Sequence, residues 1–179
     1  MNGRQLLIGV TGGIAAYKTA AVVSRLVQAG AGVSVVMTDA ATRLVGPKTF
    51  EALSGRPVRS DMWDPAVGAH PHIELAESAE LLCVAPATAN LLAKAACGLA
   101  DDLLSTLLLS FHGPVILAPA MNSRMWEKPL VQRNARQLRE DGFLFVGPEE
   151  GHLSCGTVGV GRMASPEEIF RVIGDALRK

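Results

Sequence analysis

The first feature of the sequence that could do chemistry is the turn at Gly12 and Gly13, which follows an apolar run over residues 4–10. A turn of this kind brings backbone N–H groups close to an anion at a helix N-terminus, where the helix dipole also favours negative charge. The spacing departs from both common phosphate motifs, because Tyr17 stands before Lys18 where a Walker loop has glycine, and the dinucleotide pattern G-x-G-x-x-G is not completed. The turn therefore indicates another kind of phosphate or, alternatively, a tight turn without a ligand.

Polar side chains follow two further strand-like runs. Thr38 ends one of them and offers a hydroxyl, whereas the ribose of a dinucleotide is usually held at this position by a carboxylate. Asp39 lies one residue further on, so dinucleotide binding remains an alternative. Glycine and threonine together suit a terminal phosphate monoester. In "PATAN", Pro86 leaves room for a flat ring against the backbone, and Thr88 and Asn90 can hydrogen-bond its edge. The alternative is that Thr88 is the N-cap of the next helix, and both roles can hold at once.

Histidine and cysteine supply the remaining candidates. His70 and His72 occur in "HPHIELA", where a surface or internally satisfied histidine is the simpler interpretation. Cys155 lies in a glycine-rich stretch, residues 151–163, that is typical of a flap closing over a substrate or, alternatively, of an ordinary surface loop. A zinc site needs three or four ligands, and combining these residues with His152 would require contacts that the sequence does not show, so we expect no metal.

The elements that must position these residues alternate between short apolar strands and helices. Strands are expected at the following segments: 4–10, 32–37, 81–85, 114–118 and 143–147. Helices are expected at 14–29, 40–54 with a break at Gly46-Pro47, 72–79, after "PATAN", 101–110, from "PAMNSRMW" to about Asp141, and 166–178. Residues 147–164 show no periodicity. The alternation predicts an α/β fold with a doubly wound, mostly parallel sheet, a Rossmann-like or flavodoxin-like three-layer sandwich.

Ligands of such sheets bind beyond the carboxyl ends of the strands. Here those ends are small or polar segments that are expected to meet at one rim, namely 11–13, 38–39, 86–90 and 119–122. This convergence is the strongest physical signal in the sequence.

Bulk properties fit one domain spanning residues 1–179. Hydrophobic residues make up 49% of the chain, and 17 basic residues balance 17 acidic ones, so we expect neither nucleic-acid binding nor membrane binding. We also expect no signal peptide, because the chain enters a strand-like run at once. Three cysteines without framework spacing, Cys83, Cys97 and Cys155, indicate free thiols and a cytoplasmic protein.

Taken together, the motifs resemble the family of homo-oligomeric flavin-containing cysteine decarboxylases. The segments that carry the resemblance are "GVTGGIAAYK", "HIELA", "APATANLLAKAACGLADDLL", "PAMNSRMW" and "SCGTVGVGRM", which occur in the family's order and cover nearly the whole chain. The combination of "PAMNSRMW" with a Cys-Gly flap is highly specific, whereas the Gly-Gly turn alone is not. Ser154 departs from the smaller residue expected before the flap cysteine.

The resemblance implies that the cofactor is FMN. Its phosphate is expected at Gly12, Gly13, Ile14 and Thr38, and its ribityl chain and ring at Pro86, Thr88, Ala89, Asn90 and Ala120. The segment from Ala100 to Asp102 is expected near the flavin, partly across a subunit interface. The implied roles are catalytic base for His72, proton donor for Cys155 and carboxylate-binding amide for Asn122, with Met125 and Arg162 in the same substrate pocket.

The resemblance also implies a reaction. FMN oxidises the substrate's cysteine thiol to a thioaldehyde, CO2 is lost to give an enethiolate, and members with a flap cysteine then reduce this to the saturated thiol. Cys155 therefore favours the members that convert 4'-phosphopantothenoylcysteine to 4'-phosphopantetheine in coenzyme A biosynthesis. Alternatives are a peptidyl-cysteine (lantibiotic-type) decarboxylase, a non-catalytic FMN-binding regulatory subunit and a prenyl-transferring flavoprotein. We expect a homotrimer or a dodecamer of trimers, with phosphopantothenate-cysteine ligase as a separate partner or a missing domain.

Overall fold

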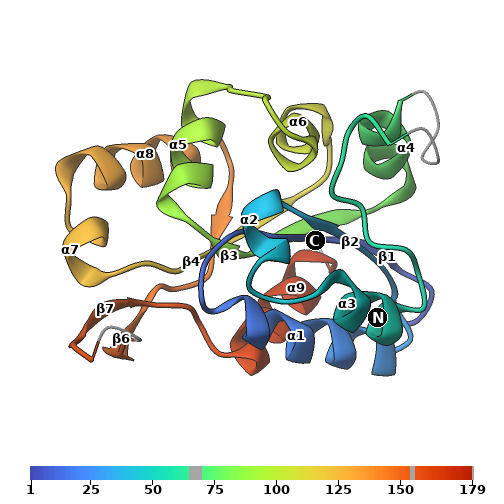
Figure 1. Cartoon of the computed structure of the whole chain (residues 1–179), viewed down its shortest axis with the longest axis horizontal. Coiled ribbons are helices and arrows are strands. Elements are labelled where there is room, and N and C mark those ends of the chain that lie inside the picture. The colour runs from blue at the N-terminus through green and yellow to red at the C-terminus, as the bar shows by residue number, and fades with distance from the viewer. Residues whose placement is uncertain (65–69, 154–155, 179) are drawn as a thin grey trace.

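The centre of the fold is a sheet of five parallel strands (Figure 1); the structure, a computed structural model, describes residues 1–64, 70–153 and 156–178. The strands are β1 (Gln5–Val10), β2 (Gly32–Met37), β3 (Leu81–Ala87), β4 (Val115–Pro119) and β5 (Leu144–Phe145). They lie in the order β2-β1-β3-β4-β5, and each neighbouring pair is parallel. The predicted doubly wound α/β fold is confirmed, and the strand order is the flavodoxin-like one.

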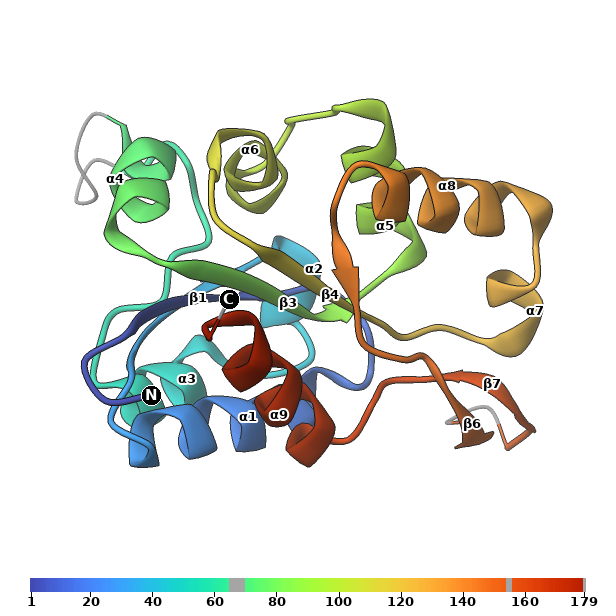
Figure 2. The same cartoon turned by 180° about the vertical axis from the view of Figure 1, so that it is seen from behind.

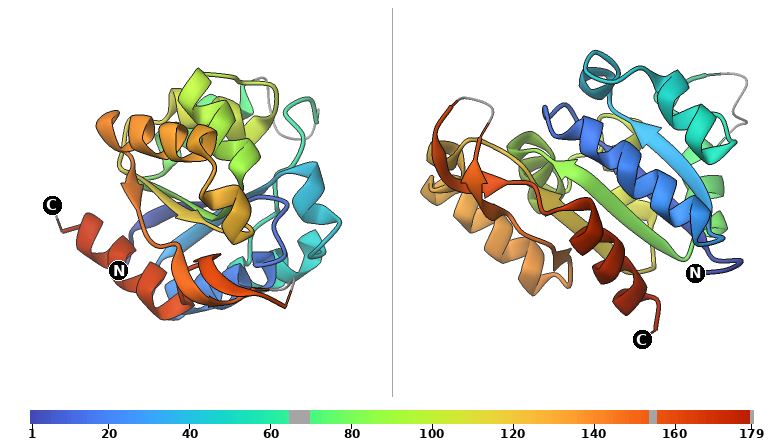
Figure 3. Two further views of the ribbon diagram at one scale, coloured as in Figure 1. Left: turned by 90° about the vertical axis from the view of Figure 1, so that its left-hand side faces the viewer. Right: turned by 90° about the horizontal axis from the view of Figure 1, so that it is seen from below.

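Helices cover both faces of this sheet, as Figures 1 and 2 show from opposite sides. One face carries α1 (Ala16–Gln28), α3 (Pro47–Ser54) and α9 (Pro166–Ala176), and the other carries α4 (Pro71–Ser78), α5 (Ala89–Cys97), α6 (Leu103–Ser110) and α8 (Pro129–Glu140). Seen from below in Figure 3, α1 and α9 run side by side across the sheet. Strands covered on both faces must be apolar along their whole length, and β3 and β4 are buried at every position.

Each face has its own hydrophobic cluster. Phe50, Ile169 and Ile173 belong to the cluster beneath α1, α3 and α9. Leu104 and Leu138 belong to the cluster beneath α5, α6 and α8. Together the two clusters fix the sheet from both sides, so that the loops at its carboxyl edge are attached to a rigid base.

The carboxyl edge of the sheet is also where several helices begin. Thr38 is the N-cap of α2 (Asp39–Thr42), Asn122 is the N-cap of α7 (Ser123–Trp126), and Thr88 and Asp102 are the N-caps of α5 and α6. In each case the side-chain oxygen accepts a hydrogen bond from a backbone N–H of the first helical turn. The expected capping role of Thr88 is thus confirmed.

Two expectations about local structure are wrong. The helix predicted to continue from "PAMNSRMW" to Asp141 is split into α7 and α8, because Pro129 disfavours helical conformation in Lys128 before it and begins a new helix as its first residue. The stretch 147–164, which shows no periodicity in the sequence, contains an antiparallel hairpin of β6 (Glu149–His152) and β7 (Val158–Arg162).

Candidate functional site

Two adjoining cavities lie at the carboxyl edge of the sheet. Cavity 1 has a volume of about 510 Å³ and is lined by Gly12, Gly13, Ile14, Ala15, Tyr17, Lys18, Thr88, Ala89, Ala120, Met121, Asn122, Met125, His152, Leu153, Gly161, Arg162 and Met163. Cavity 2 has a volume of about 530 Å³ and is lined by Thr11, Gly12, Thr38, Asp39, Ala40, Thr88, Ala89, Asn90, Leu91, Lys94, Asp101, Asp102 and Met125. The two share Gly12, Thr88, Ala89 and Met125, so they form one crevice.

The crevice brings together most of the residues predicted from the sequence. Those that line it are Gly12, Gly13, Ile14, Thr38, Thr88, Ala89, Asn90, Ala120, Asn122, Met125 and Arg162. Pro86 lies directly behind this lining, because a Cβ atom added to Gly13 would lie 3.2 Å from Pro86 Cγ. Four separate segments of the chain therefore meet as expected at the edge of the sheet.

The glycine turn is narrow and presents free donors. A Cβ atom on Gly12 would lie 2.5 Å from the Cβ of Ala40, so only glycine fits beside α2. In the described part of the chain, the N–H groups of Ile14 and Ala15 make no hydrogen bond, as is usual for the first donors of a helix. These N–H groups lie at the N-terminus of α1, where an anion is favoured.

Thr38 lines cavity 2 together with Gly12 of the glycine turn. Its backbone N–H donates to the Val10 carbonyl at 3.0 Å, which ties the end of β2 to the end of β1. The next residue, Asp39, is paired with Arg43 at 2.6 Å on the exposed side of α2. This ion pair offsets the negative charge beside the threonine.

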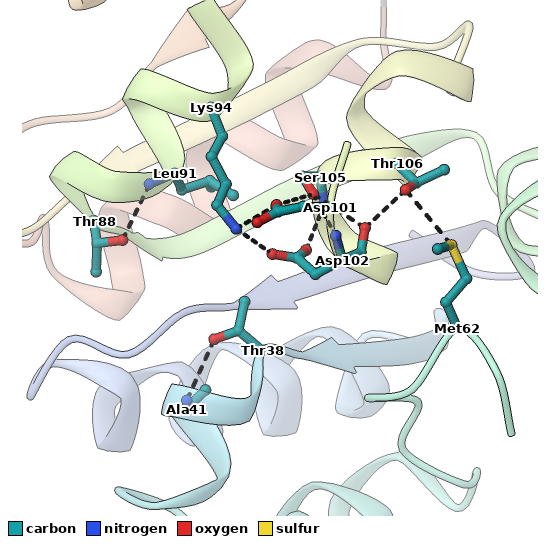
Figure 4. Close-up of polar contacts among 10 residues, drawn as sticks. All are labelled: Thr38, Ala41, Met62, Thr88, Leu91, Lys94, Asp101, Asp102, Ser105 and Thr106. Carbon is teal, nitrogen blue, oxygen red and sulfur yellow. Dashed lines mark hydrogen bonds and ion pairs between the residues drawn. The ribbon is translucent and has the colours of Figure 1, made fainter. Parts of the chain in front are cut away.

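The wall of cavity 2 contains an ion-pair cluster (Figure 4). Asp101 and Asp102 belong to the segment expected near the flavin, whereas their pairing with Lys94 is not predicted from the sequence. The Lys94 ammonium lies 2.5 Å from Asp101 and 2.7 Å from Asp102, and its side chain is only 14% exposed. Asp102 also accepts a 2.8 Å hydrogen bond from the Ser105 N–H. Lys94 is the one basic residue in segment 88–110, and Asp101 and Asp102 are its acidic residues. One cation and two carboxylates in an otherwise uncharged segment are the feature of the sequence from which their pairing could have been predicted.

The cluster favours the charged forms of Lys94 and Asp102. Burial acts to lower the pKa of Lys94, but the hydrogen bonds and charges of the two carboxylates outweigh it, so the pKa lies above its usual value. Burial likewise acts to raise the pKa of Asp102, but the bonds from Lys94 and Ser105 bring it below its usual value. The cluster therefore fixes the turn that joins α5 to α6 at neutral pH.

The far wall of cavity 1 combines the loop before α7 with the hairpin. The Met121 N–H donates to the Gly161 carbonyl at 2.9 Å, and a Cβ atom on Gly161 would overlap the Met121 carbonyl oxygen. Asn122 Oδ1 accepts from the Arg124 N–H at 2.8 Å. Arg162 donates to Glu149 at 2.8 Å across the base of the hairpin. The hairpin thus touches the Asn122 loop through backbone, at a glycine.

One of the predicted catalytic residues, His72, does not lie in the crevice. His72 lies in the first turn of α4, and it is not among the described residues that line either cavity. Figures 1 and 2 show α4 at one end of its helical layer and the β6–β7 hairpin at the opposite end of the molecule. The buried Nδ1 atom of His72 has no hydrogen-bond partner in the described part of the chain. Cys155 lies outside the described residues.

Neither of the two described cysteines lines the crevice. Cys83 is buried in β3, and burial raises its pKa to about 12. Cys97 is exposed at the end of α5 and does not line the crevice. Among the described residues, no three His, Cys, Asp or Glu side chains are arranged to hold a metal ion. None of the described helices combines the length and the apolar character that crossing a bilayer requires.

A sequence model of the flavoprotein family matches residues 1–178. The chain belongs to the flavoprotein family. The expected flavin cofactor is confirmed at the level of the family. This flavoprotein is 49% identical over 175 residues to the coenzyme A biosynthesis bifunctional protein CoaBC of Bacillus subtilis (strain 168), covering 96% of the chain and 43% of the relative. It thus spans less than half the length of the curated relatives that it matches.

Solved structures agree in fold along the whole chain. The flavoprotein resembles the FMN-dependent cysteine decarboxylase SpaF with a TM-score of 0.85 and 38% identity, covering 98% of this chain and 96% of SpaF. It resembles a PPC decarboxylase variant complexed with pantothenoylaminoethenethiol with a TM-score of 0.87 and 28% identity, covering 98% and 99% of the two chains.

Proposed function

We propose that this flavoprotein is an FMN-dependent carboxy-lyase that converts 4'-phosphopantothenoylcysteine to 4'-phosphopantetheine in coenzyme A biosynthesis. The observation that carries the proposal is the crevice itself, where the glycine turn, the "PATAN" loop and the Asn122 loop meet. The names of the relatives support it, because CoaBC is a coenzyme A biosynthesis protein and SpaF is an FMN-dependent cysteine decarboxylase. We further propose that residues 1–179 act as one domain.

The residues of the crevice fit FMN. The N–H groups of Ile14 and Ala15, beside Gly12 and Thr38, would hold a phosphate monoester at the N-terminus of α1. The other predicted contacts, with the ribityl chain and ring, are Pro86, Thr88, Ala89, Asn90 and Ala120. When bound, FMN supplies the two-electron oxidation of the substrate thiol and the later return of those electrons.

The chain's own residues would bind and orient the substrate. The amide of Asn122 donates a hydrogen bond to the substrate carboxylate, which aligns the bond that breaks when CO2 leaves. Met125 and Arg162 line the same cavity and contribute to the substrate pocket. His72 accepts a proton during oxidation of the thiol, and Cys155 gives a proton to the carbon of the enethiol during the final reduction.

The position of His72 supports a shared site. Because α4 lies at the opposite end of the molecule from the hairpin (Figure 2), a second copy of the chain would have to bring its own His72 to the crevice. We therefore propose a homotrimer, or a larger assembly of trimers, with each site formed between neighbours. The ligase that joins phosphopantothenate to cysteine would supply the substrate, and we propose a cytoplasmic location for both enzymes.

Complementation tests this arrangement. Assayed with substrate well below the wild-type KM, His72→Asn and Asn122→Asp chains should each retain little activity alone. Co-expressed in equal amounts and mixed at random, they should regain about a quarter of the wild-type activity, because that fraction of shared sites receives one intact residue from each neighbour. A site built within one chain would regain nothing, and that result would reject the shared site while leaving the reaction itself untouched.

Product analysis tests the reaction. The purified protein should be yellow and should release CO2 and 4'-phosphopantetheine from synthetic 4'-phosphopantothenoylcysteine, as judged by mass spectrometry. An enethiol product from peptides that end in cysteine would instead indicate a peptidyl-cysteine decarboxylase. Bound FMN without turnover of either substrate would indicate a regulatory flavoprotein. A colourless protein that cannot be reconstituted with FMN would contradict all three.

A further inference from the structure

Two buried threonines, Thr11 and Thr19, bond to neighbouring carbonyls at the end of β3. Thr11 Oγ1 donates to the Pro86 carbonyl at 2.6 Å, and Thr19 Oγ1 donates to the Ala85 carbonyl, also at 2.6 Å. Their exposed fractions are 2% and 0%. Each hydroxyl therefore satisfies the hydrogen-bonding requirement of one carbonyl at the buried end of β3.

The two threonines differ in one further bond and in location. Thr11 Oγ1 also accepts a 3.2 Å hydrogen bond from the Thr88 N–H, and the residue lines cavity 2 immediately before Gly12. A hydroxyl has one donor and two acceptor positions, so one Thr11 side chain can hold both bonds at once. Thr19 is the fourth residue of α1, six residues after Gly13, and does not line the crevice.

We propose that Thr11 is a positioning residue that fixes the glycine turn to the "PATAN" loop, so that the crevice is already shaped for FMN before the cofactor binds. The inference rests on the proposed FMN function. The glycine turn would hold the phosphate, and residues 86–90 would contact the ribityl chain and ring. The Thr11 hydroxyl is a direct side-chain link between these two halves, and Gly13 packs against Pro86 beside it. When the loops need no rearrangement, no free energy of FMN binding is lost in ordering them, and the affinity is higher.

Replacing each threonine with valine gives a matched comparison. Valine has nearly the same shape but no hydroxyl, so both variants lose a buried hydrogen bond to the end of β3 and should lower the melting temperature of the apoprotein. The fall should be somewhat larger in Thr11→Val, which also loses the bond from the Thr88 N–H. The FMN dissociation constant, measured by flavin fluorescence titration of the apoprotein, should rise roughly tenfold or more in Thr11→Val, because the two loops are no longer held at the correct separation. In Thr19→Val it should stay within about twofold of the wild-type value.

Two further variants complete the test. Thr11→Ser keeps the hydroxyl and should restore FMN affinity together with the visible circular dichroism of the bound flavin. If a valine variant does not fold, Thr11→Ala and Thr19→Ala repeat the same comparison without placing a methyl group against a carbonyl. Equal FMN affinities in the Thr11 and Thr19 variants would overturn the positioning role, while a wild-type protein that fails to bind FMN would instead overturn the proposed function.

Discussion

The two walls of cavity 1 are built in different ways. One wall consists of the loops that leave β1 and β3, and it is tied together by the buried Thr11 side chain. The other wall combines the Asn122 loop with the β6–β7 hairpin, in which Val158 is 61% exposed. The hairpin contacts the Asn122 loop through the backbone at Gly161.

The two walls differ in how much of their stability comes from the sheet. The wall formed by the loops after β1 and β3 is anchored to a sheet that is buried on both faces, so we expect it to keep its shape without a ligand. A two-stranded hairpin has little stability of its own and depends on what it packs against. The half of the crevice expected to hold the cofactor is therefore preformed, whereas the half expected to contact the substrate is held in place by a few contacts.

The largest effect is expected from Gly161→Ala. The new methyl group would overlap the Met121 carbonyl oxygen, and the backbone φ of +150° is one that other residues rarely adopt. The hairpin must therefore shift away from the Asn122 loop. We expect turnover of 4'-phosphopantothenoylcysteine to fall roughly a hundredfold, since a displacement of about 1 Å at a reacting centre has effects of that size. FMN affinity should remain close to that of the wild type.

Gly159→Ala is the matched control. Its new methyl group would meet the hydroxyl of Ser123, which has no hydrogen-bond partner among the described residues and can rotate. The loss of turnover should therefore be much smaller. Equal losses in the two variants, or a loss of FMN binding in Gly161→Ala, would show that the two walls are not separable in this way.

Asn122→Asp should have the next largest effect. The carboxylate can still accept the hydrogen bond from the Arg124 N–H that caps α7, so the fold should persist. Its negative charge would face the substrate carboxylate, and we expect the substrate dissociation constant to rise roughly fiftyfold. The KM for 4'-phosphopantothenoylcysteine, measured from CO2 release by the holoprotein, reports this change. Unchanged substrate affinity would remove Asn122 from carboxylate recognition.

The same contrast explains what the sequence could predict. Strands such as β1 and β3 are unbroken apolar runs, and the rule that ligands bind beyond their carboxyl ends was sufficient to bring Gly12, Thr38 and Thr88 together. The hairpin was missed because Gly151, Gly159 and Gly161 interrupt the alternation of apolar and polar residues that marks a strand.

Other features were missed for different reasons. The break between α7 and α8 has a local signal in Pro129, which the helical periodicity concealed. The pairing of Lys94 with Asp102 depends on how the turn between α5 and α6 folds back, and residue spacing does not determine that. The place of His72 at the far end of its layer depends on the packing of α4 against α6, and it cannot be derived from the "HIELA" motif alone.

Lys94→Met should have a moderate effect on stability. It leaves Asp101 and Asp102 without their cation, and we expect a loss on the order of 1 kcal/mol, because the pair is only partly buried. Lys94→Arg keeps the charge and should lose less. Thermal unfolding of the apoprotein measures both variants.

The loss should depend on pH in a defined direction. The lowered pKa of Asp102 gives stability that is present above the carboxyl's unfolded pKa, about 4, and is lost as pH falls through its folded value. The raised pKa of Lys94 gives stability that is present below its unfolded value and is lost as pH rises through the folded one. The difference between wild type and Lys94→Met should therefore be largest near neutral pH. A difference that grows in acid would contradict the ion-pair interpretation.

The smallest effect is expected from Glu149→Gln at the base of the hairpin. Glu149 pairs with Arg162 at 2.8 Å, and its other oxygen accepts a 3.3 Å bond from the Ser165 N–H, which a glutamine oxygen can also accept. Since both charged side chains are partly exposed, we expect the stability to change by less than about 0.5 kcal/mol.

Arg162 lines cavity 1, and without its carboxylate partner it should attract an anionic substrate more strongly. The KM should therefore fall slightly while FMN affinity stays constant. A rise in KM would instead show that the ion pair holds Arg162 in its binding position, and the hairpin wall would then be as preorganised as the loop wall opposite.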